Sequence, residues 1–160
     1  MLVKAFYFLA LFLASLALGP ALAHLFEWPN KINLSRADYL TVQQIYRGWA
    51  LLGIVIFPAV ISALVLTLLL RKEWRPFVFS LIGFLSLAGT QVVFWTYTFP
   101  ANQATNSWTI LPDNWEQLRP QWEYSHATSA VLNVIAVAAL ILSLLAYKAA
   151  STPRLLVVTR

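Results

Sequence analysis

The sequence predicts an all-α integral membrane protein, in which residues 1–160 form a single transmembrane domain built as a four-helix bundle. Two observations predict this fold class. Of the 160 residues, 60% are hydrophobic and only 11% are charged, whereas a water-soluble domain carries about a quarter charged residues. The apolar residues also gather in four runs, and each run reaches the length of about 20 residues that a membrane-spanning helix needs.

We expect the four spanning helices to cover about residues 2–26, 48–70, 77–97 and 126–147. Each run is rich in Leu, Ala, Val and Phe, and none shows the alternation of a β-strand. A helix also satisfies its own backbone hydrogen bonds, which lipid cannot do.

The connections between these runs differ in length. Residues 71–76 form a short basic turn. In residues 27–47, Ser35 and Asp38 resemble a helix N-cap with an acid in the first turn, so we expect residues 39–46 to form a short helix at the membrane surface. Residues 98–125 make a long loop for a compact bundle, and long loops tend to be functional or disordered. The tryptophans of this loop indicate order.

The basic residues predict how the bundle is oriented. Seven of them lie on the side of both termini and four lie on the side of the two long loops. Because Lys and Arg accumulate in cytoplasmic loops, we expect a cell-membrane protein with both termini in the cytoplasm and both long loops facing outward. The seven are Lys4, Arg71, Lys72, Arg75, Lys148, Arg154 and Arg160, and the four are Lys31, Arg36, Arg47 and Arg119.

The first run has a second interpretation. Lys4, the apolar run and the Ala-Leu-Ala sequence of residues 21–23 also match a secretory signal peptide. Cleavage would remove residues 1–23 and make His24 the N-terminal residue, a position from which histidine can chelate copper. We favour a retained helix, because the run carries a stripe of small residues suited to helix packing in lipid.

Small and polar residues at helical spacing mark the faces that we expect to point into the bundle. Polar side chains within membrane segments usually face the bundle interior. These residues are Ala10, Ala14, Ala17, Ala21 and His24 in the first run, Ala88, Gln91 and Trp95 in the third, and His126, Ser129, Ala130, Asn133 and Ala136 in the fourth.

The only two histidines of the chain fall at similar depth, near the same end of the bundle. Glu27 follows His24 by three residues and Glu123 precedes His126 by three, and residues three apart are neighbours on a helix. One hypothesis is a metal site formed by these four residues, because imidazole and carboxylate bind zinc, copper and iron. The cofactor would then be a single transition metal, and otherwise none. The alternative is that each histidine only hydrogen-bonds to its own glutamate or to a loop carbonyl.

A second hypothesis is acid–base catalysis without a metal. His126 would be the general base and Glu123 would orient it, because histidine titrates near neutral pH. Asn102, Gln91 and Arg47 would stabilise an oxygen of the substrate. The alternative is that Arg47 and Gln91 are only hydrogen-bonding groups at the end of the bundle.

The aromatic residues of the loop side allow two interpretations. Trp and Tyr usually anchor a protein at the membrane interface. A minority of them, Trp95 and Trp122 included, would instead wall a pocket for a flat apolar ligand.

Several of these residues are similar to those of a known family. The Phe-Pro-Ala-Asn stretch at 99–102, the segment 39–49, and the series Trp115, Arg119, Trp122 and His126 resemble the four-helix membrane family that includes the anthrone oxygenases. The resemblance implies an oxygenase that converts an anthrone-like polycyclic phenol to a quinone with molecular oxygen and need not use a cofactor. It also implies that Asn102, Trp122 and His126 belong to the site.

We therefore expect a small multi-pass membrane oxidoreductase, an anthrone-oxygenase-like monooxygenase with an outward-facing pocket for a flat phenolic substrate. Its partners are the lipid bilayer and a small aromatic ligand. The basic residues form no stripe, so no nucleic-acid partner is expected. The chain has no cysteine, which excludes thiolate catalysis and iron–sulfur sites. The alternatives are a metal-binding membrane protein and a non-catalytic membrane subunit. The predicted site residues are His126, Glu123 and Asn102 for catalysis, Trp122, Gln91, Trp95 and Arg47 for substrate binding, and His24, Glu27, His126 and Glu123 for a metal.

Overall fold

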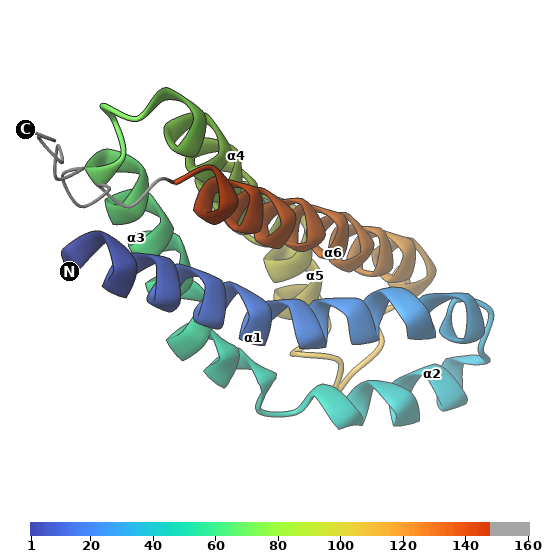
Figure 1. Ribbon diagram of the computed structural model, residues 1–160. Helices are drawn as coiled ribbons and strands as arrows, with labels where there is room; N and C mark the ends of the chain where they lie inside the picture. The colour runs from blue at the N-terminus through green and yellow to red at the C-terminus, as the bar shows by residue number, and fades with distance from the viewer. Residues whose placement is uncertain (148–160) are drawn as a thin grey trace, which may run out of the picture.

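The computed structural model describes residues 1–147, which are mostly helical and contain no strand. Four long helices form the bundle: α1 (Leu2–Lys31), α3 (Gly53–Leu69), α4 (Trp74–Val93) and α6 (Trp115–Ala146). Helix α1 packs against α3 and α6, and α4 packs against the same two helices, so the four helices close a ring (Figure 1).

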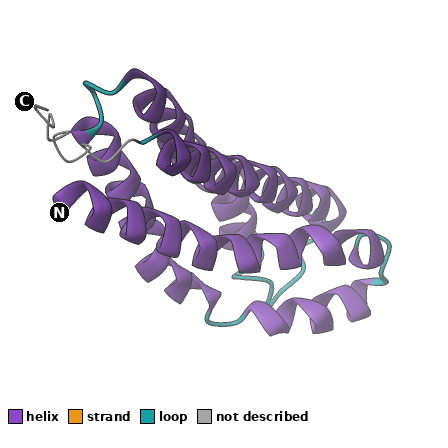
Figure 2. Cartoon of the chain, in the orientation of Figure 1, coloured by secondary structure: helices purple, strands orange, loops and turns teal. Residues whose placement is uncertain are grey.

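Shorter helical segments join the long helices, and loops make up little of the chain (Figure 2). They are α2 (Arg36–Gln43), two 3₁₀ turns (Gln44–Tyr46 and Trp49–Leu52), a π-helical turn (Phe94–Thr98) and α5 (Phe99–Ala104).

Within residues 1–147, four helical stretches are long and apolar enough to cross a membrane: Leu2–Lys31, Trp49–Leu69, Trp74–Ala104 and Trp115–Ala146. The predicted all-α bundle with four spanning helices is therefore confirmed. The start of α1, the α3–α4 turn and the end of α6 lie at one end of the bundle, here called the terminal end, while α2 lies at the other, here called the polar end (Figure 1).

The basic residues at the terminal end predict that it faces the cytoplasm, and this orientation stays a prediction. Lys148, Arg154 and Arg160, which contribute to it, lie outside the described residues.

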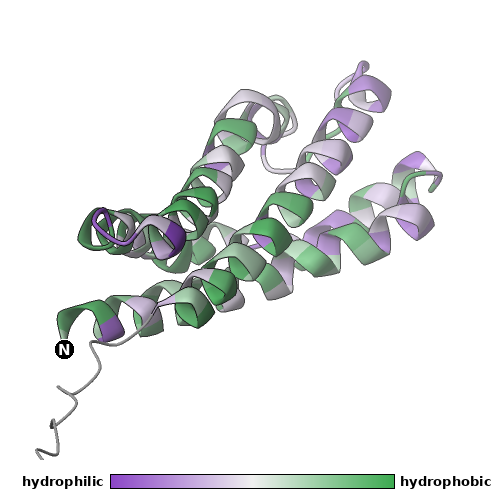
Figure 3. Cartoon of the chain, turned by 45° about the horizontal axis from the view of Figure 1, so that its top comes forward, coloured by the Kyte–Doolittle hydropathy of each residue, from purple (hydrophilic) through white to green (hydrophobic). Residues whose placement is uncertain are grey.

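The helices extend further than their apolar runs. Helix α1 continues to Lys31, the third stretch continues to Ala104, and α6 begins at Trp115. The expected long loop over residues 98–125 is therefore wrong, since only residues 105–114 are non-helical. Hydropathy marks the part of a helix that lipid can surround, and these helices carry polar turns beyond it (Figure 3).

The short surface helix after residues 35–38 is confirmed. The Oγ atom of Ser35 accepts a hydrogen bond from the backbone N–H of Asp38 at 3.2 Å, which caps the start of α2. The helix begins at Arg36, before the predicted residue 39, and a 3₁₀ turn carries it on to Tyr46.

Small residues let the long helices approach closely. Ala10 and Ala14 of α1 are fully buried, as are Ala130 and Ala136 of α6, so most of the predicted inward faces are correct. At Gly83 of α4, an added Cβ atom would lie 2.8 Å from a side-chain atom of Leu140 in α6. The absence of a side chain there allows the close contact between α4 and α6.

The inward face predicted for Ala88, Gln91 and Trp95 ends before Trp95. This tryptophan is 53% exposed, whereas Thr98 and Ala101 are buried. The π-helical turn over Phe94–Thr98 closes over five residues instead of four and shifts the register of the faces. Trp95 itself lies to one side of the inner face of α4, which Leu87 and Thr90 bury.

Candidate functional site

The two histidines meet inside the polar end. The ring of His24 in α1 stacks on the ring of His126 in α6, with centroids 4.0 Å apart and ring planes tilted by 26°. His24 is buried and His126 is partly buried. Their approach follows from the two inward faces, which place both residues on the α1–α6 contact.

Glu27 holds His24 in place from the next turn of the same helix. The Nδ1 atom of His24 lies 3.0 Å from Oε1 of Glu27, and it is the donor when the carboxylate is ionised. Within residues 1–147, no hydrogen bond engages the nitrogens of His126. The pair therefore combines one anchored imidazole with one whose nitrogens remain available.

A buried lysine lies beside the pair. Lys31 is only 2% exposed, and its Nζ atom lies 3.1 Å from Glu27 and 3.3 Å from Glu123. It also donates to the hydroxyl of Tyr46 at 2.7 Å, and that hydroxyl donates to Glu27. Lysine is almost never this buried unless it is paired. One ammonium between two carboxylates leaves the cluster one negative charge in excess when both acids are ionised.

Glu123 points toward α2 and not toward His126. Its Oε1 atom accepts a hydrogen bond from Tyr39 at 2.7 Å, and Gln43 donates to the same tyrosine hydroxyl at 2.6 Å. The predicted pairing of Glu123 with His126 is therefore wrong. Two residues spaced by three share a helix face, but Lys31 and Tyr39 attract the carboxylate away from the imidazole.

Two oxygen atoms of this network are buried without a hydrogen-bond donor in the described part of the chain. They are Oε2 of Glu123 and Oε1 of Gln43. Buried polar atoms are nearly always paired, so these two exceptions call for an explanation.

The Tyr39 hydroxyl is held in its neutral form. Burial, followed by the nearby charge of Glu123, raises the pKa of Tyr39 well above its ordinary value of 10.0. It therefore acts in this network as a stable hydrogen-bond donor and not as a base.

Trp122 forms a wall of the site. Its ring centroid lies 4.1 Å from that of His126 and 5.1 Å from that of His24. Its indole N–H donates to Oδ1 of Asn102 at 2.8 Å, and Trp108 donates to the same oxygen at 3.2 Å. Asn102 therefore positions two indoles, and its carbonyl oxygen is already in use.

The other predicted substrate-binding residues have contacts of their own. Arg47 is exposed and donates to Gln44 at 2.8 Å. Gln91 donates to the neighbouring Thr90 at 3.1 Å. Trp95 contacts Phe94 and Phe99, on the side that faces away from the bundle.

The geometry of the pair suits a metal poorly. The lone pairs of an imidazole lie in the ring plane, so two nearly parallel stacked rings cannot aim at one ion without turning. In residues 1–147, no group of three or more His, Cys, Asp or Glu side chains is arranged to hold one. The metal hypothesis gains no support from this arrangement and stays a prediction.

Sequence reasoning missed Lys31, Tyr39 and Tyr46. From the sequence, Lys31 is only one of the charges on the loop side. The sequence does contain a pattern that predicts the place of Lys31. His24, Glu27 and Lys31 are spaced by three and four and so share one helix face. Nothing local connects Tyr39 or Tyr46 to that face.

Comparison with protein-family models, curated proteins and solved structures finds no match for this chain. The resemblance to the anthrone oxygenases therefore stays a prediction.

Proposed function

We propose that this chain is a small multi-pass membrane enzyme in which His126 removes a proton from a flat, weakly acidic substrate. The substrate class is a phenol or an activated methylene beside a carbonyl, as in an anthrone. The observation that carries the proposal is the contact of His126 with His24, which Glu27 anchors.

The surroundings of the pair favour proton transfer. A general base must have a nitrogen free to accept a proton, and the nitrogens of His126 make no hydrogen bond within residues 1–147. Two stacked imidazoles repel each other when both are charged, so the pair takes one proton at a time.

The aromatic residues around the pair suit a flat substrate. Trp122, Tyr46 and Trp49 have ring centroids 4.5 to 5.2 Å from that of His24. Offset and edge-to-face contacts at these distances are those that aromatic rings prefer. Because the two imidazoles touch, a substrate would approach His126 from its partly exposed side.

The redox step follows from the resemblance to the anthrone oxygenases. Loss of a proton turns the methylene into a carbanion, which passes electrons to molecular oxygen. One oxygen atom ends as the new carbonyl of the quinone, and the other leaves as water with the two hydrogens lost from the methylene. His126 supplies only the proton transfer.

The test is to supply an anthrone and oxygen to the purified full chain and to follow quinone formation by absorbance. His126→Ala should lower the rate about 10²- to 10⁴-fold, the usual contribution of a general base. Gln103→Ala, at an exposed position next to Asn102, is the matched control and should keep the wild-type rate. Equal rates from wild type and His126→Ala would remove the assignment, provided that the melting temperatures agree.

Elemental analysis separates this proposal from the metal hypothesis. The proposal expects protein purified without chelator to hold no stoichiometric zinc, copper or iron. One metal ion per chain, lost in both His24→Ala and His126→Ala, would replace the acid–base proposal with a metal site.

A further inference from the structure

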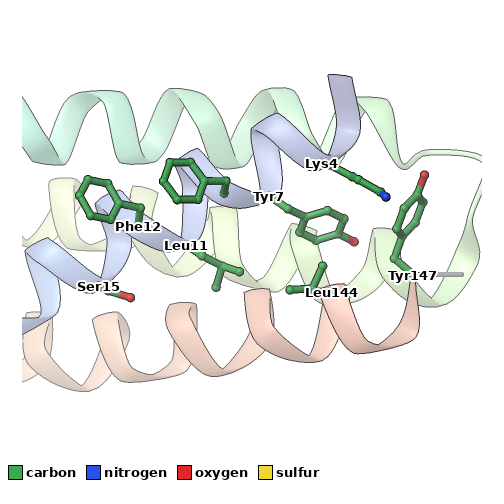
Figure 4. A pocket seen from close by; sticks show the side chains of 8 residues that line it. Lys4, Tyr7, Leu11, Phe12, Ser15, Leu144 and Tyr147 are labelled. Atoms are coloured by element: carbon green, nitrogen blue, oxygen red, sulfur yellow. The ribbon is translucent and has the colours of Figure 1, made fainter. Parts of the chain in front are cut away.

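A groove lies between α1 and α6 at the terminal end, away from the histidine pair (Figure 4). Its volume is about 670 Å³. The groove is apolar along its length, with Phe8, Leu11 and Phe12 of α1 on one side and Leu144 of α6 on the other. The only charged side chain that lines it, among the described residues, is Lys4.

The charged and phenolic groups of the groove lie at its rim, whereas the hydroxyl of Ser15 lies at its other end (Figure 4). The ammonium group of Lys4 and the hydroxyl of Tyr147 lie at the same end (Figure 4). Lys4 is exposed, and no ion pair engages it within residues 1–147. The groove therefore offers a cation and a phenol at its mouth and hydrocarbon below.

Hydrogen bonds hold the floor of the groove to α6. Tyr7 is buried, and its hydroxyl lies 3.0 Å from the backbone oxygen of Ser143 and 2.9 Å from the Oγ atom of the same residue. The rings of Phe8 and Phe12 stack with centroids 5.6 Å apart. Phe8 and Phe12 are nevertheless 65% and 50% exposed, so the stacked pair forms a wall whose outer surface is uncovered.

The length of the groove matches one leaflet of a bilayer. It runs along α1 from Lys4 to Ser15, which at a rise of about 1.5 Å per residue is about 17 Å. Half of a hydrocarbon core about 30 Å thick is about 15 Å. An acyl chain whose headgroup lies at Lys4 would therefore end near the bilayer centre.

The positive charge of the terminal end favours an anionic lipid headgroup. The terminal end carries four basic residues, which are Lys4 near the start of α1 and Arg71, Lys72 and Arg75 at the α3–α4 turn. Among residues 1–147, Glu73 is the only acidic residue at this end. Clustered Lys and Arg beside a membrane attract anionic lipids. A zwitterionic headgroup would bring its own cation close to Lys4 and lose part of this attraction.

We propose that the groove is a specific site for an anionic phospholipid, with one acyl chain between α1 and α6 and the phosphate at Lys4 and Tyr147. The site is independent of the proposed acid–base function, because the two share no residue.

The experiment is native mass spectrometry of the full chain in detergent, supplied with equal amounts of phosphatidylglycerol and phosphatidylcholine that carry the same acyl chains. Wild type should retain one phosphatidylglycerol per chain in preference to phosphatidylcholine. Lys4→Gln should lower this preference about five-fold, the effect expected for one basic residue at a membrane surface. Lys72→Gln is the matched control, since Lys72 is exposed at the same end but does not line the groove.

A second variant tests the groove itself. Leu144→Trp fills the groove from a position that is already 42% exposed, so the bundle should fold with an unchanged melting temperature and retain neither lipid. Equal retention of the two lipids by wild type would overturn the proposal. Equal losses of the preference for phosphatidylglycerol in Lys4→Gln and Lys72→Gln would also overturn it, because they indicate diffuse attraction. Retention of phosphatidylglycerol by Leu144→Trp at the wild-type level would overturn it as well.

Discussion

The hydroxyl of Tyr39 donates a hydrogen bond to the carboxylate of Glu123, 2.7 Å away, and both side chains are almost fully buried. Tyr39 belongs to the surface helix α2 and Glu123 to the spanning helix α6. The bond therefore fastens α2 to the bundle. It also keeps Glu123 engaged with Lys31, which lies 3.3 Å from the same oxygen.

The ammonium of Lys31 should be essential for the stability of the polar end. Lys31→Met leaves the buried carboxylate of Glu123 without its counter-charge, and breaking a buried ion pair costs about 3–5 kcal/mol. Adding Glu123→Gln should restore part of the loss, because it removes the orphaned charge. Thermal unfolding in one detergent measures both effects. Lys72→Met, an exposed control, should stay within about 0.5 kcal/mol of wild type, and an equally small effect of Lys31→Met would contradict the buried charge cluster.

Alkaline pH should loosen α2 through Tyr39. Its pKa is raised in the folded protein, chiefly by burial, whereas in the unfolded chain it ionises near pH 10, the usual value for tyrosine. Its contribution to stability is therefore complete below that pH and is lost as the pH rises above it, because the unfolded state then binds fewer protons.

Unfolding free energies measured from about pH 9 to about pH 11 check this effect. Tyr39→Phe should be less stable than wild type at neutral pH, by about 1–3 kcal/mol for the bond lost to a buried carboxylate. Its stability should also fall less steeply with rising pH. Tyr124→Phe, at an exposed position, should keep the wild-type slope. Parallel slopes for wild type and Tyr39→Phe would show that Tyr39 ionises normally.

The contact between α4 and α6 should be sensitive to a single methyl group. Gly83→Ala places a Cβ atom 2.8 Å from Leu140, and such overpacking costs about 1–3 kcal/mol. Gly89→Ala is the matched control, because its Cβ atom would lie at an ordinary 3.4 Å from Leu132. That variant should gain up to about 1 kcal/mol from the better helix propensity of alanine. Equal melting temperatures for the two variants would argue against the close approach of α4 and α6 at Gly83.

The first 23 residues should remain in the mature protein. Helix α1 supplies Tyr7, Ala10 and Ala14 to the buried core, and the hydroxyl of Tyr7 bonds to Ser143 of α6. A signal peptide would take these contacts away from the folded bundle. Intact mass measurement of protein extracted from membranes checks this, and a mass that lacks residues 1–23 would support the signal-peptide interpretation instead.

Much of the fold was predictable because it depends on local properties of the chain. The four spanning runs are set by hydropathy, and the cap at Ser35 is set by four consecutive residues. The helix ends were less predictable. The polar turns after His24 and before His126 stay helical beyond the apolar runs, although their composition resembles that of loops.

The candidate site was predictable in part. The pairing of His24 with Glu27 follows from a spacing of three on one helix, and the structure has that pair. The same spacing did not predict the partner of Glu123. Its carboxylate accepts a hydrogen bond from Tyr39, which is 84 residues away in the sequence but close in the fold. Trp95 failed for a different reason, since the inner face of α4 runs through Gly83, Leu87 and Thr90 and Trp95 lies to one side of it.

Composition and short-range spacing thus account for the spanning helices, for the inward faces of α1 and α6, and for one of the two histidine–glutamate pairs. Folding in three dimensions was needed to stack His24 on His126, to bury Lys31 between two carboxylates and to bring α2 onto α6. The physical reason is the distance along the chain over which each effect acts. Hydropathy and helical periodicity act within a few turns, whereas a buried charge is stabilised by whichever distant partners the packed helices bring to it.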